Sequence, residues 1–194
     1  MSIWISKAVG LTLVLAGLVA CQPVPGLPNL PLASATAPVV VLADAVKVAG
    51  PRGYCADPSS VQEIDDSAVV LLGRCSADSP QSPALLTVTV GRAGSASAIA
   101  SGGADLAALF NSDAGRATLS RSGKARDVTI GTALSQNDVF LMRVEDRVLG
   151  PYWRGMVAVK GRLISVSATG PGLAREIGRG LVQDTAEAIR RSNR

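Results

Sequence analysis

A short apolar segment near the carboxyl end places the strongest constraint on the fold. Residues 157–166 read Val-Ala-Val-Lys-Gly-Arg-Leu-Ile-Ser-Val. A two-residue loop at Lys160-Gly161 pairs Val157 with Ile164 and puts the other valines on the same face as these two. The segment therefore predicts a β-hairpin that gives an antiparallel sheet one strongly apolar face.

Several other segments carry the signals of strands. Residues 68–75 form a compact run rich in Val and Leu, and residues 84–91 alternate Leu and Val with Thr. The first pattern is typical of a buried strand and the second of a strand with one buried face. Further strands are expected at residues 138–145 and 152–159, an interrupted one at residues 46–54, and short ones at residues 116–120 and 125–130.

Two segments have the periodicity of helices. Residues 104–111 place Leu and Phe side chains at helical spacing. A second helix is expected to start at Thr169-Gly170-Pro171, because Pro is favoured in a first turn. Gly178 and Gly180 weaken this helix but allow a close approach to the sheet. Its apolar stripe is expected to be Leu173, Ile177, Leu181 and Ile189.

These elements predict one α+β domain over residues 45–194. Its antiparallel sheet of about six strands carries a mid-chain helix and a carboxyl-terminal helix, as an α/β/α sandwich. The sequence shows no internal repeat, and about 150 residues are ample for one hydrophobic core.

The amino terminus has the features of a signal peptide. A short segment containing Lys7 precedes an uncharged apolar run of 13 residues from Ala8 to Ala20. A membrane-spanning helix needs about 20 apolar residues, so this run is too short to be one. Residues 1–20 are therefore expected to be a signal peptide.

The apolar run ends in Leu18-Val19-Ala20-Cys21, which resembles the lipobox of bacterial lipoproteins. The resemblance implies that Cys21 is acylated and anchors the mature chain in a lipid bilayer; several acyl chains together anchor a protein stably. Gln22 stands where the family's inner-membrane sorting signal is Asp. It implies the periplasmic face of the outer membrane, rather than the inner membrane. The alternative is an ordinary secretory signal peptide followed by a chance Cys.

Residues 21–44 are expected to form a lipidated, Pro-rich tether. Five of the 11 prolines in the chain lie in this segment. Proline lacks a backbone donor and breaks helices, so an extended polyproline II conformation is expected. The alternative is a loop packed on the domain, which the run Val39-Val40-Val41 permits.

Composition narrows the possible chemistry. The chain contains 0 His and 3 Cys, which excludes Ser-His-Asp and Cys-His catalysis and every His-ligated metal or haem site. We predict no catalytic residue, no metal site and no other cofactor. Once Cys21 is acylated, Cys55 and Cys75 remain, and in an oxidising compartment they are expected to form a structural disulfide. The alternative is a redox or metal-binding thiol pair.

Two groups of residues are candidates for a binding surface. Tyr152-Trp153 supplies aromatic side chains of the kind that anchor interfaces. Adjacent strand residues face opposite sides, so one of the two is expected to be buried and the other to lie on the far face. Core packing is the alternative for both. The second group is a local basic stretch of Arg116, Arg121, Lys124 and Arg126.

The basic stretch, together with the carboxyl-terminal arginines, would suit lipid headgroups, glycan carboxylates or lipopolysaccharide phosphates. The alternative is an ordinary solvated surface. The formal net charge is +4, and removal of Lys7 with the signal peptide lowers it to +3. Nucleic acid is not an expected partner, because the sequence does not interleave aromatic and basic residues.

Wider similarity is limited to short strings. Gly53-Tyr54-Cys55-Ala56-Asp57 and Leu71-Leu72-Gly73-Arg74-Cys75, followed by Tyr152-Trp153 and Gly161-Arg162, resemble small alphaproteobacterial lipoproteins of unassigned activity. The order of strands, mid-chain helix, strands and final helix is similar to the PsbP-like fold. That fold-level similarity carries no functional residue across.

The function expected from these features is that of a membrane-anchored periplasmic lipoprotein with a non-catalytic binding or envelope-structural role. Its partner would be an envelope protein or glycan. One alternative is a periplasmic hydrolase that uses carboxylates or a Ser/Lys pair, with Lys124 or Lys160 beside a Ser or Asp. Another is a small-molecule or lipid carrier, which requires an apolar cavity between sheet and helix.

Overall fold

The computed structural model describes residues 37–100 and 102–194. The predicted signal peptide, the lipobox with Cys21 and most of the predicted tether therefore lie outside the described residues. Among the described residues, no helix is long and apolar enough to cross a membrane.

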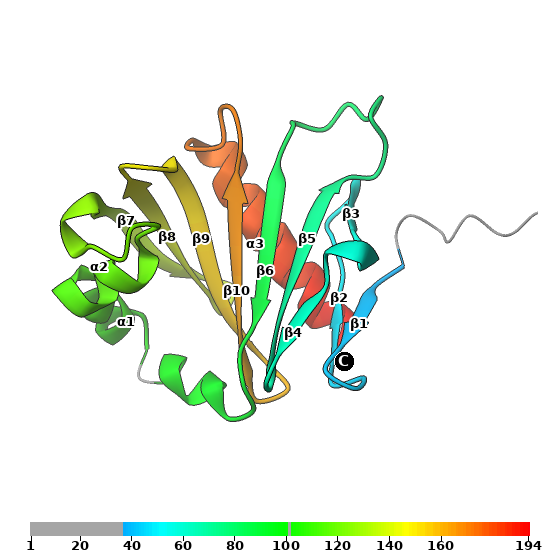
Figure 1. Cartoon of the computed structure of the whole chain (residues 1–194), viewed down its shortest axis with the longest axis horizontal. Helices are drawn as coiled ribbons and strands as arrows, with labels where there is room; N and C mark the ends of the chain where they lie inside the picture. Colours follow the sequence, from blue (N-terminus) through cyan, green and yellow to red (C-terminus); the bar gives the residue numbers. More distant parts are fainter. Residues whose placement is uncertain (1–36, 101) are drawn as a thin grey trace, which may run out of the picture. The chain divides into compact units, whose positions relative to one another are not determined.

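The described chain is built on an antiparallel sheet of eight strands (Figure 1). The strand order is β3-β5-β6-β10-β9-β8-β7, and β4 also pairs with β5. The α+β class and the large antiparallel sheet are confirmed. The sheet has more strands than expected, partly because β3 and β4 are short and both pair with β5. The strands are β3 (Tyr54–Ala56), β4 (Gln62–Ile64), β5 (Ser67–Arg74), β6 (Leu85–Val90), β7 (Val128–Gln136), β8 (Val139–Asp146), β9 (Gly150–Val159) and β10 (Arg162–Thr169).

The described residues form three α-helices, α1 (Gly103–Asn111), α2 (Asp113–Leu119) and α3 (Glu176–Ser192), and short 3₁₀ helices η1 (Pro58–Ser60), η2 (Ser95–Ile99) and η3 (Ala125–Asp127). The predicted mid-chain and carboxyl-terminal helices are α1 and α3. The strand predicted at residues 116–120 is wrong, because most of this segment belongs to α2. Ser112 Oγ accepts the Gly115 N–H at 3.1 Å and caps that helix.

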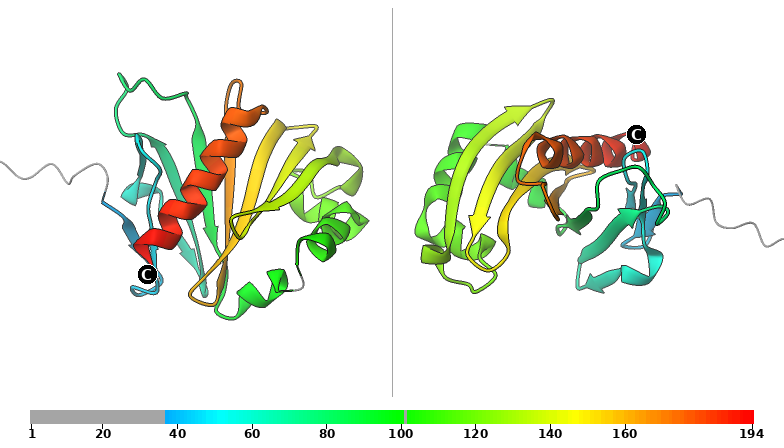
Figure 2. Two further views of the ribbon diagram at one scale, coloured as in Figure 1. Left: turned by 180° about the vertical axis from the view of Figure 1, so that it is seen from behind. Right: turned by 90° about the horizontal axis from the view of Figure 1, so that it is seen from above.

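Helices cover the two faces of the sheet unequally (Figures 1 and 2). On the first face, α3 lies across the sheet, and Val182 and Ile189 pack into the core formed by the inward residues of β5, β6, β9 and β10. On the second face, α1 and α2 lie over β7, β8 and β9, where Leu106 and Phe110 pack with Phe140. Over β5, β6 and β10, no α-helix of the described chain covers the second face (Figure 1).

The hairpin predicted around Lys160-Gly161 is confirmed. Val157 pairs with Ile164, as the two-residue loop requires. Lys160 and Gly161 have φ values of 48° and 75°, and positive φ at both central positions is what a type I′ turn needs. The loop chemistry therefore sets the register of β9 and β10.

The carboxyl-terminal helix differs from its prediction in start and orientation. It begins at Glu176, because residues 170–175 form a turn instead. Ile177, placed on the predicted stripe, is 57% exposed. The buried face lies one residue further along and is made mostly of small side chains: Gly178, Val182, Thr185, Ala186, Ala188 and Ile189.

The close approach of helix and sheet comes from a glycine of the sheet. A Cβ on Gly155 of β9 would lie 2.5 Å from Val182 Cγ1 of α3. A Cβ on Gly180 would meet nothing within 4 Å. A Cβ on Gly178 would collide with the Leu173 carbonyl in the preceding turn, not with the sheet. The expectation that Gly178 and Gly180 allow the approach is therefore wrong.

The folded domain begins before residue 45. β1 (Val39–Val41) pairs with β2 (Val46–Val48), and both Val41 and Val46 are fully buried in the main core. The predicted tether boundary at residue 44 is wrong for this segment, because its β-branched run pairs and packs. The alternative of a segment packed on the domain holds for residues 39–44.

Candidate functional site

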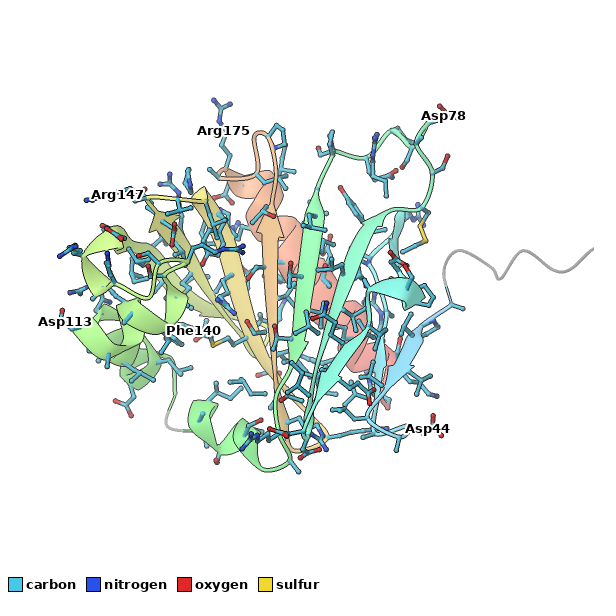
Figure 3. The ribbon with its side chains drawn as sticks, viewed as in Figure 1. Asp44, Asp78, Asp113, Phe140, Arg147 and Arg175 are labelled. Atoms are coloured by element: carbon cyan, nitrogen blue, oxygen red, sulfur yellow. A yellow bond between two sulfur atoms is a disulfide. The ribbon has the colours of Figure 1, made fainter. Side chains whose placement is uncertain are left out.

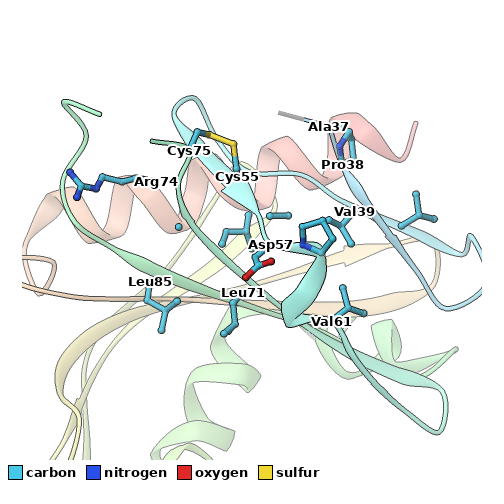
Figure 4. A pocket seen from close by; sticks show the side chains of 15 residues that line it. Ala37, Pro38, Val39, Cys55, Asp57, Val61, Leu71, Arg74, Cys75 and Leu85 are labelled. Atoms are coloured by element: carbon cyan, nitrogen blue, oxygen red, sulfur yellow. A yellow bond between two sulfur atoms is a disulfide. The ribbon is translucent and has the colours of Figure 1, made fainter. Parts of the chain in front are cut away.

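A pocket lies at one edge of the sheet (Figure 4). Its volume is about 960 Å³, and its walls come from the start of β1, from β3, from the turn at η1, and from β5 and β6. Most of the lining is apolar, including Val39, Val61, Leu71 and Leu85. Leu85 is 46% exposed, so the pocket also offers apolar surface to solvent. We refer to it below as the edge pocket.

The Cys55–Cys75 disulfide lies in the wall of the edge pocket (Figure 4). It joins β3 to the residue that follows β5, with a Cα–Cα distance of 5.0 Å. The Cys75 N–H also donates to the Gly53 carbonyl at 3.0 Å. The predicted disulfide is confirmed, and it fastens the three-residue edge strand β3 to the sheet.

The charged side chains of the edge pocket make hydrogen bonds to the loops around it. Asp57 Oδ1 accepts the N–H of Ser59 at 2.9 Å and its hydroxyl at 2.6 Å, which caps η1. These bonds hold the pKa of Asp57 below its usual value. Arg74 donates to the Ser79 carbonyl at 3.2 Å. The chemistry left for a ligand inside the pocket is therefore mainly apolar contact.

Tyr152 and Trp153 are both buried, at 3% exposure each. They do lie on opposite faces, since Tyr152 packs in the core under α1 and α2 and Trp153 in the core under α3. Trp153 Nε1 donates to the Ala174 carbonyl at 3.2 Å. Core packing, the alternative for this pair, therefore holds for both residues, and the prediction of a binding surface at Tyr152-Trp153 is wrong, because helices cover both faces at this point of β9.

The predicted basic stretch does not form a single positive face. Arg116 is half-buried and pairs with Asp113 at 2.5 Å. Arg121, Lys124 and Arg126 are exposed between α2 and β7, but Asp127 and Asp146 lie among them. The carboxyl-terminal arginines belong to α3, on the other face of the sheet (Figures 2 and 3). The structure therefore does not bring the two basic groups together.

Lys124 and Lys160, the lysines of the hydrolase alternative, both lie exposed beside or in turns. Among residues 37–100 and 102–194, no hydrogen bond or ion pair joins either lysine to a Ser or Asp side chain. In the same residues no group of three or more metal-binding side chains is gathered.

Asp146, which bonds the basic segment, is a buried carboxylate at 3% exposure. Its oxygens accept the N–H groups of Arg121 at 2.9 Å, Val148 at 2.6 Å and Leu149 at 2.9 Å. Burial alone raises the pKa of Asp146, but these three bonds outweigh it and hold the pKa below its usual value. The carboxylate thus ties the loop after α2 to the β8–β9 turn.

The Asp146→Asn substitution should lower the free energy of unfolding by about 1–3 kcal/mol, measured by urea denaturation at pH 7. An amide keeps one acceptor oxygen, so the Arg121 N–H loses its partner. Because the folded pKa lies below the unfolded one, the wild-type advantage is present above the unfolded pKa and vanishes as the pH falls through the folded pKa. The difference between the two proteins should begin to shrink below about pH 4. A stability difference that is constant down to pH 2 would contradict this role.

A polar strip crosses the helix-free part of the second face, and sequence reasoning missed it. Thr89 and Thr87 of β6 pair with Ser165 and Ser167 of β10. Beside them on β9, Arg154 is half-buried, and its Nε donates to Ser165 Oγ at 2.7 Å. The residues that the structure describes offer Arg154 no carboxylate partner.

A sequence signal for Arg154 existed. It is the only charged residue between Gly150 and Val159. The predicted hairpin register already placed Arg154 opposite Ser167, on the face away from Val157 and Ile164.

Comparison with known proteins adds no assignment. No protein-family model matches the chain, and no curated protein or solved structure matches it.

Proposed function

We propose that this chain is a bacterial envelope lipoprotein whose domain binds a ligand or partner without catalysis. In this proposal Cys21 is acylated and holds the protein at the periplasmic face of the outer membrane. The Pro-rich residues that follow Cys21 connect the anchor to the domain.

The observation that carries the proposal is a solvent-open, mainly apolar pocket walled by a disulfide. A volume of about 960 Å³ lies in the range of ligand-binding clefts. A disulfide persists in oxidising compartments such as the periplasm, which fits the export implied by the lipobox.

A small-molecule or lipid carrier is the second candidate, favoured by the same pocket. The edge pocket lies at the edge of the sheet, whereas the carrier hypothesis predicted a cavity between sheet and helix. Where α3 crosses β9, helix and sheet are in close contact, since a Cβ on Gly155 would lie 2.5 Å from Val182 Cγ1. A carried ligand would thus bind at the sheet edge.

The Cys21→Ala substitution should move the protein from the membrane fraction to the soluble fraction, or leave it as an unprocessed precursor that keeps its signal peptide. Immunoblots after cell fractionation measure both the location and the size of the protein. Mass spectrometry of the wild-type amino-terminal peptide should show an acylated Cys21. The matched control is Cys55→Ser/Cys75→Ser, which removes the other cysteines and should leave fractionation unchanged.

A crosslinking pull-down from envelopes, comparing the wild type with Cys21→Ala, then identifies the partner. Partners captured only by the anchored form are those that meet the domain at the membrane. An unmodified Cys21, or identical fractionation of the two proteins, would contradict the proposed anchor.

A further inference from the structure

One cross-strand row connects Arg154 with the edge pocket. Arg154 pairs with Ser167, Ser167 with Thr87, and Thr87 with Leu71, which lines the pocket. Paired residues of neighbouring strands point to the same face, and the strands lie about 4.8 Å apart, so the row spans roughly 14 Å from β9 to β5. A cationic group, two hydroxyl groups and an apolar pocket thus follow one another on the open face of the sheet.

Arg154 has the properties of an anion-binding residue. The bond from its Nε to Ser165 Oγ orients the guanidinium plane, and Ser165 itself is 8% exposed. The Tyr152 hydroxyl also interacts with the guanidinium. Asp146 is the carboxylate that interacts electrostatically with Tyr152. Its oxygens already accept hydrogen bonds from three backbone N–H groups. The guanidinium therefore keeps donors for a planar anion.

The hydroxyl groups between Arg154 and the edge pocket are also available. In the part of the chain that the structure describes, neither the Ser167 nor the Thr87 side chain makes a hydrogen bond. Both residues are partly exposed. A ligand lying along the row can therefore accept hydrogen bonds close to Arg154 and meets the apolar side chains of Leu71 and Leu85 further on.

We propose that this row and the edge pocket together bind a single-chain anionic amphiphile. Its carboxylate or phosphate head pairs with Arg154 and accepts from Ser167 and Thr87, while its hydrocarbon chain crosses Leu71 into the edge pocket. An uncharged sugar would leave the guanidinium without a counter-charge and the pocket without an apolar group. The inference rests on the proposed binding function and names its ligand class.

Isothermal titration calorimetry tests the inference with dodecanoate and dodecyl phosphate as probes. The sample is the sequence from Gln22 onward, exported behind a cleavable signal peptide, so that no attached lipid competes for the site. Both clusters of buried apolar residues, which run from Val41 to Ile189, lie within this sample. The wild type should bind at least one probe, and dodecanol and acetate should bind at least tenfold more weakly. Binding of dodecanoate alone would indicate a fatty acid, and binding of dodecyl phosphate alone a phosphate-headed lipid.

Arg154→Met should weaken binding by about tenfold or more, the size expected for loss of one charge-assisted pair. Arg175→Met is the matched control, because Arg175 is exposed in the turn before α3, away from the row (Figure 3). Leu85→Asp is a second variant at a half-exposed position, where contact between the new carboxylate and the hydrocarbon chain should weaken binding without removing core packing. Circular dichroism establishes that each variant is folded.

Three results would overturn the inference: no binding of either probe, equal affinity for dodecanol and dodecanoate, or full affinity in Arg154→Met and Leu85→Asp. These results are independent of the anchor. Amphiphile binding by a protein whose Cys21 is unmodified would refute the proposed lipoprotein and leave the ligand assignment standing. Membrane release in Cys21→Ala without amphiphile binding would do the reverse.

Discussion

Replacing Gly155 with alanine is expected to lower the free energy of unfolding by about 3 kcal/mol, the upper end of the usual range for overpacking. A Cβ at this position would lie 2.5 Å from Val182 Cγ1, 3.2 Å from Leu141 Cδ2 and 3.3 Å from Val139 Cγ1. All three neighbours have 0% exposure, so none can turn into solvent. The added methyl group must therefore push α3 away from β9. Urea denaturation of the purified domain measures the loss.

The matched control is Gly73→Ala in β5, where a Cβ would meet nothing within 4 Å. That substitution removes the same backbone freedom from the unfolded chain without a clash, so its effect should stay within about 0.5 kcal/mol of zero.

A compensating change separates steric clash from any other effect of Gly155→Ala. Val182→Ala removes the methyl group nearest to the added Cβ. In the double variant Gly155→Ala/Val182→Ala, the loss should be smaller than the sum of the single losses by at least about 1 kcal/mol. Strictly additive losses, or an equally large loss in Gly73→Ala, would contradict the packing argument.

The parts of the fold that were predictable from the sequence are those with a local physical cause. The β9–β10 hairpin follows from a two-residue turn that contains Gly161 and lies between two apolar strands, and β6 from its Leu/Val and Thr alternation. The helix α2 escaped prediction, because residues 116–120 contain no local feature that opposes a strand. Its cap, Ser112, precedes them. The buried face of α3 could not be predicted either, because it depends on the position of Gly155 in β9, where Val182 of the helix packs.

The candidate site shows the same division between local and tertiary causes. The disulfide could be predicted because two thiols remained once Cys21 was assigned to the anchor. Strand alternation correctly placed Tyr152 and Trp153 on opposite faces, but no local pattern shows that helices cover both of them. The edge pocket combines β1, β3, β5 and β6, which are separated along the chain, so only the folded arrangement defines it.

Removal of the Cys55–Cys75 disulfide, in the variant Cys55→Ser/Cys75→Ser, is expected to lower the free energy of unfolding by about 3 kcal/mol. The two cysteines are 20 residues apart, and closing a loop of this length removes about that much conformational entropy from the unfolded chain in the chain-entropy model. In the folded state, β3 has three residues and pairs only with β5 among the described strands. Urea denaturation with and without dithiothreitol measures the effect.

Reductant supplies the internal control. Dithiothreitol should bring the wild type close to the double variant and should leave the double variant unchanged. Equal wild-type stability in both conditions, or two titratable thiols in the exported protein, would show that the bridge is not formed.

The same samples separate the two roles of the bridge. If the disulfide also holds the wall of the edge pocket in place, reduction should weaken dodecanoate binding under conditions where circular dichroism shows a folded domain. If affinity persists while stability falls, the β4–β5 pairing and the Asp57 cap are sufficient to shape the pocket, and the disulfide acts on stability alone.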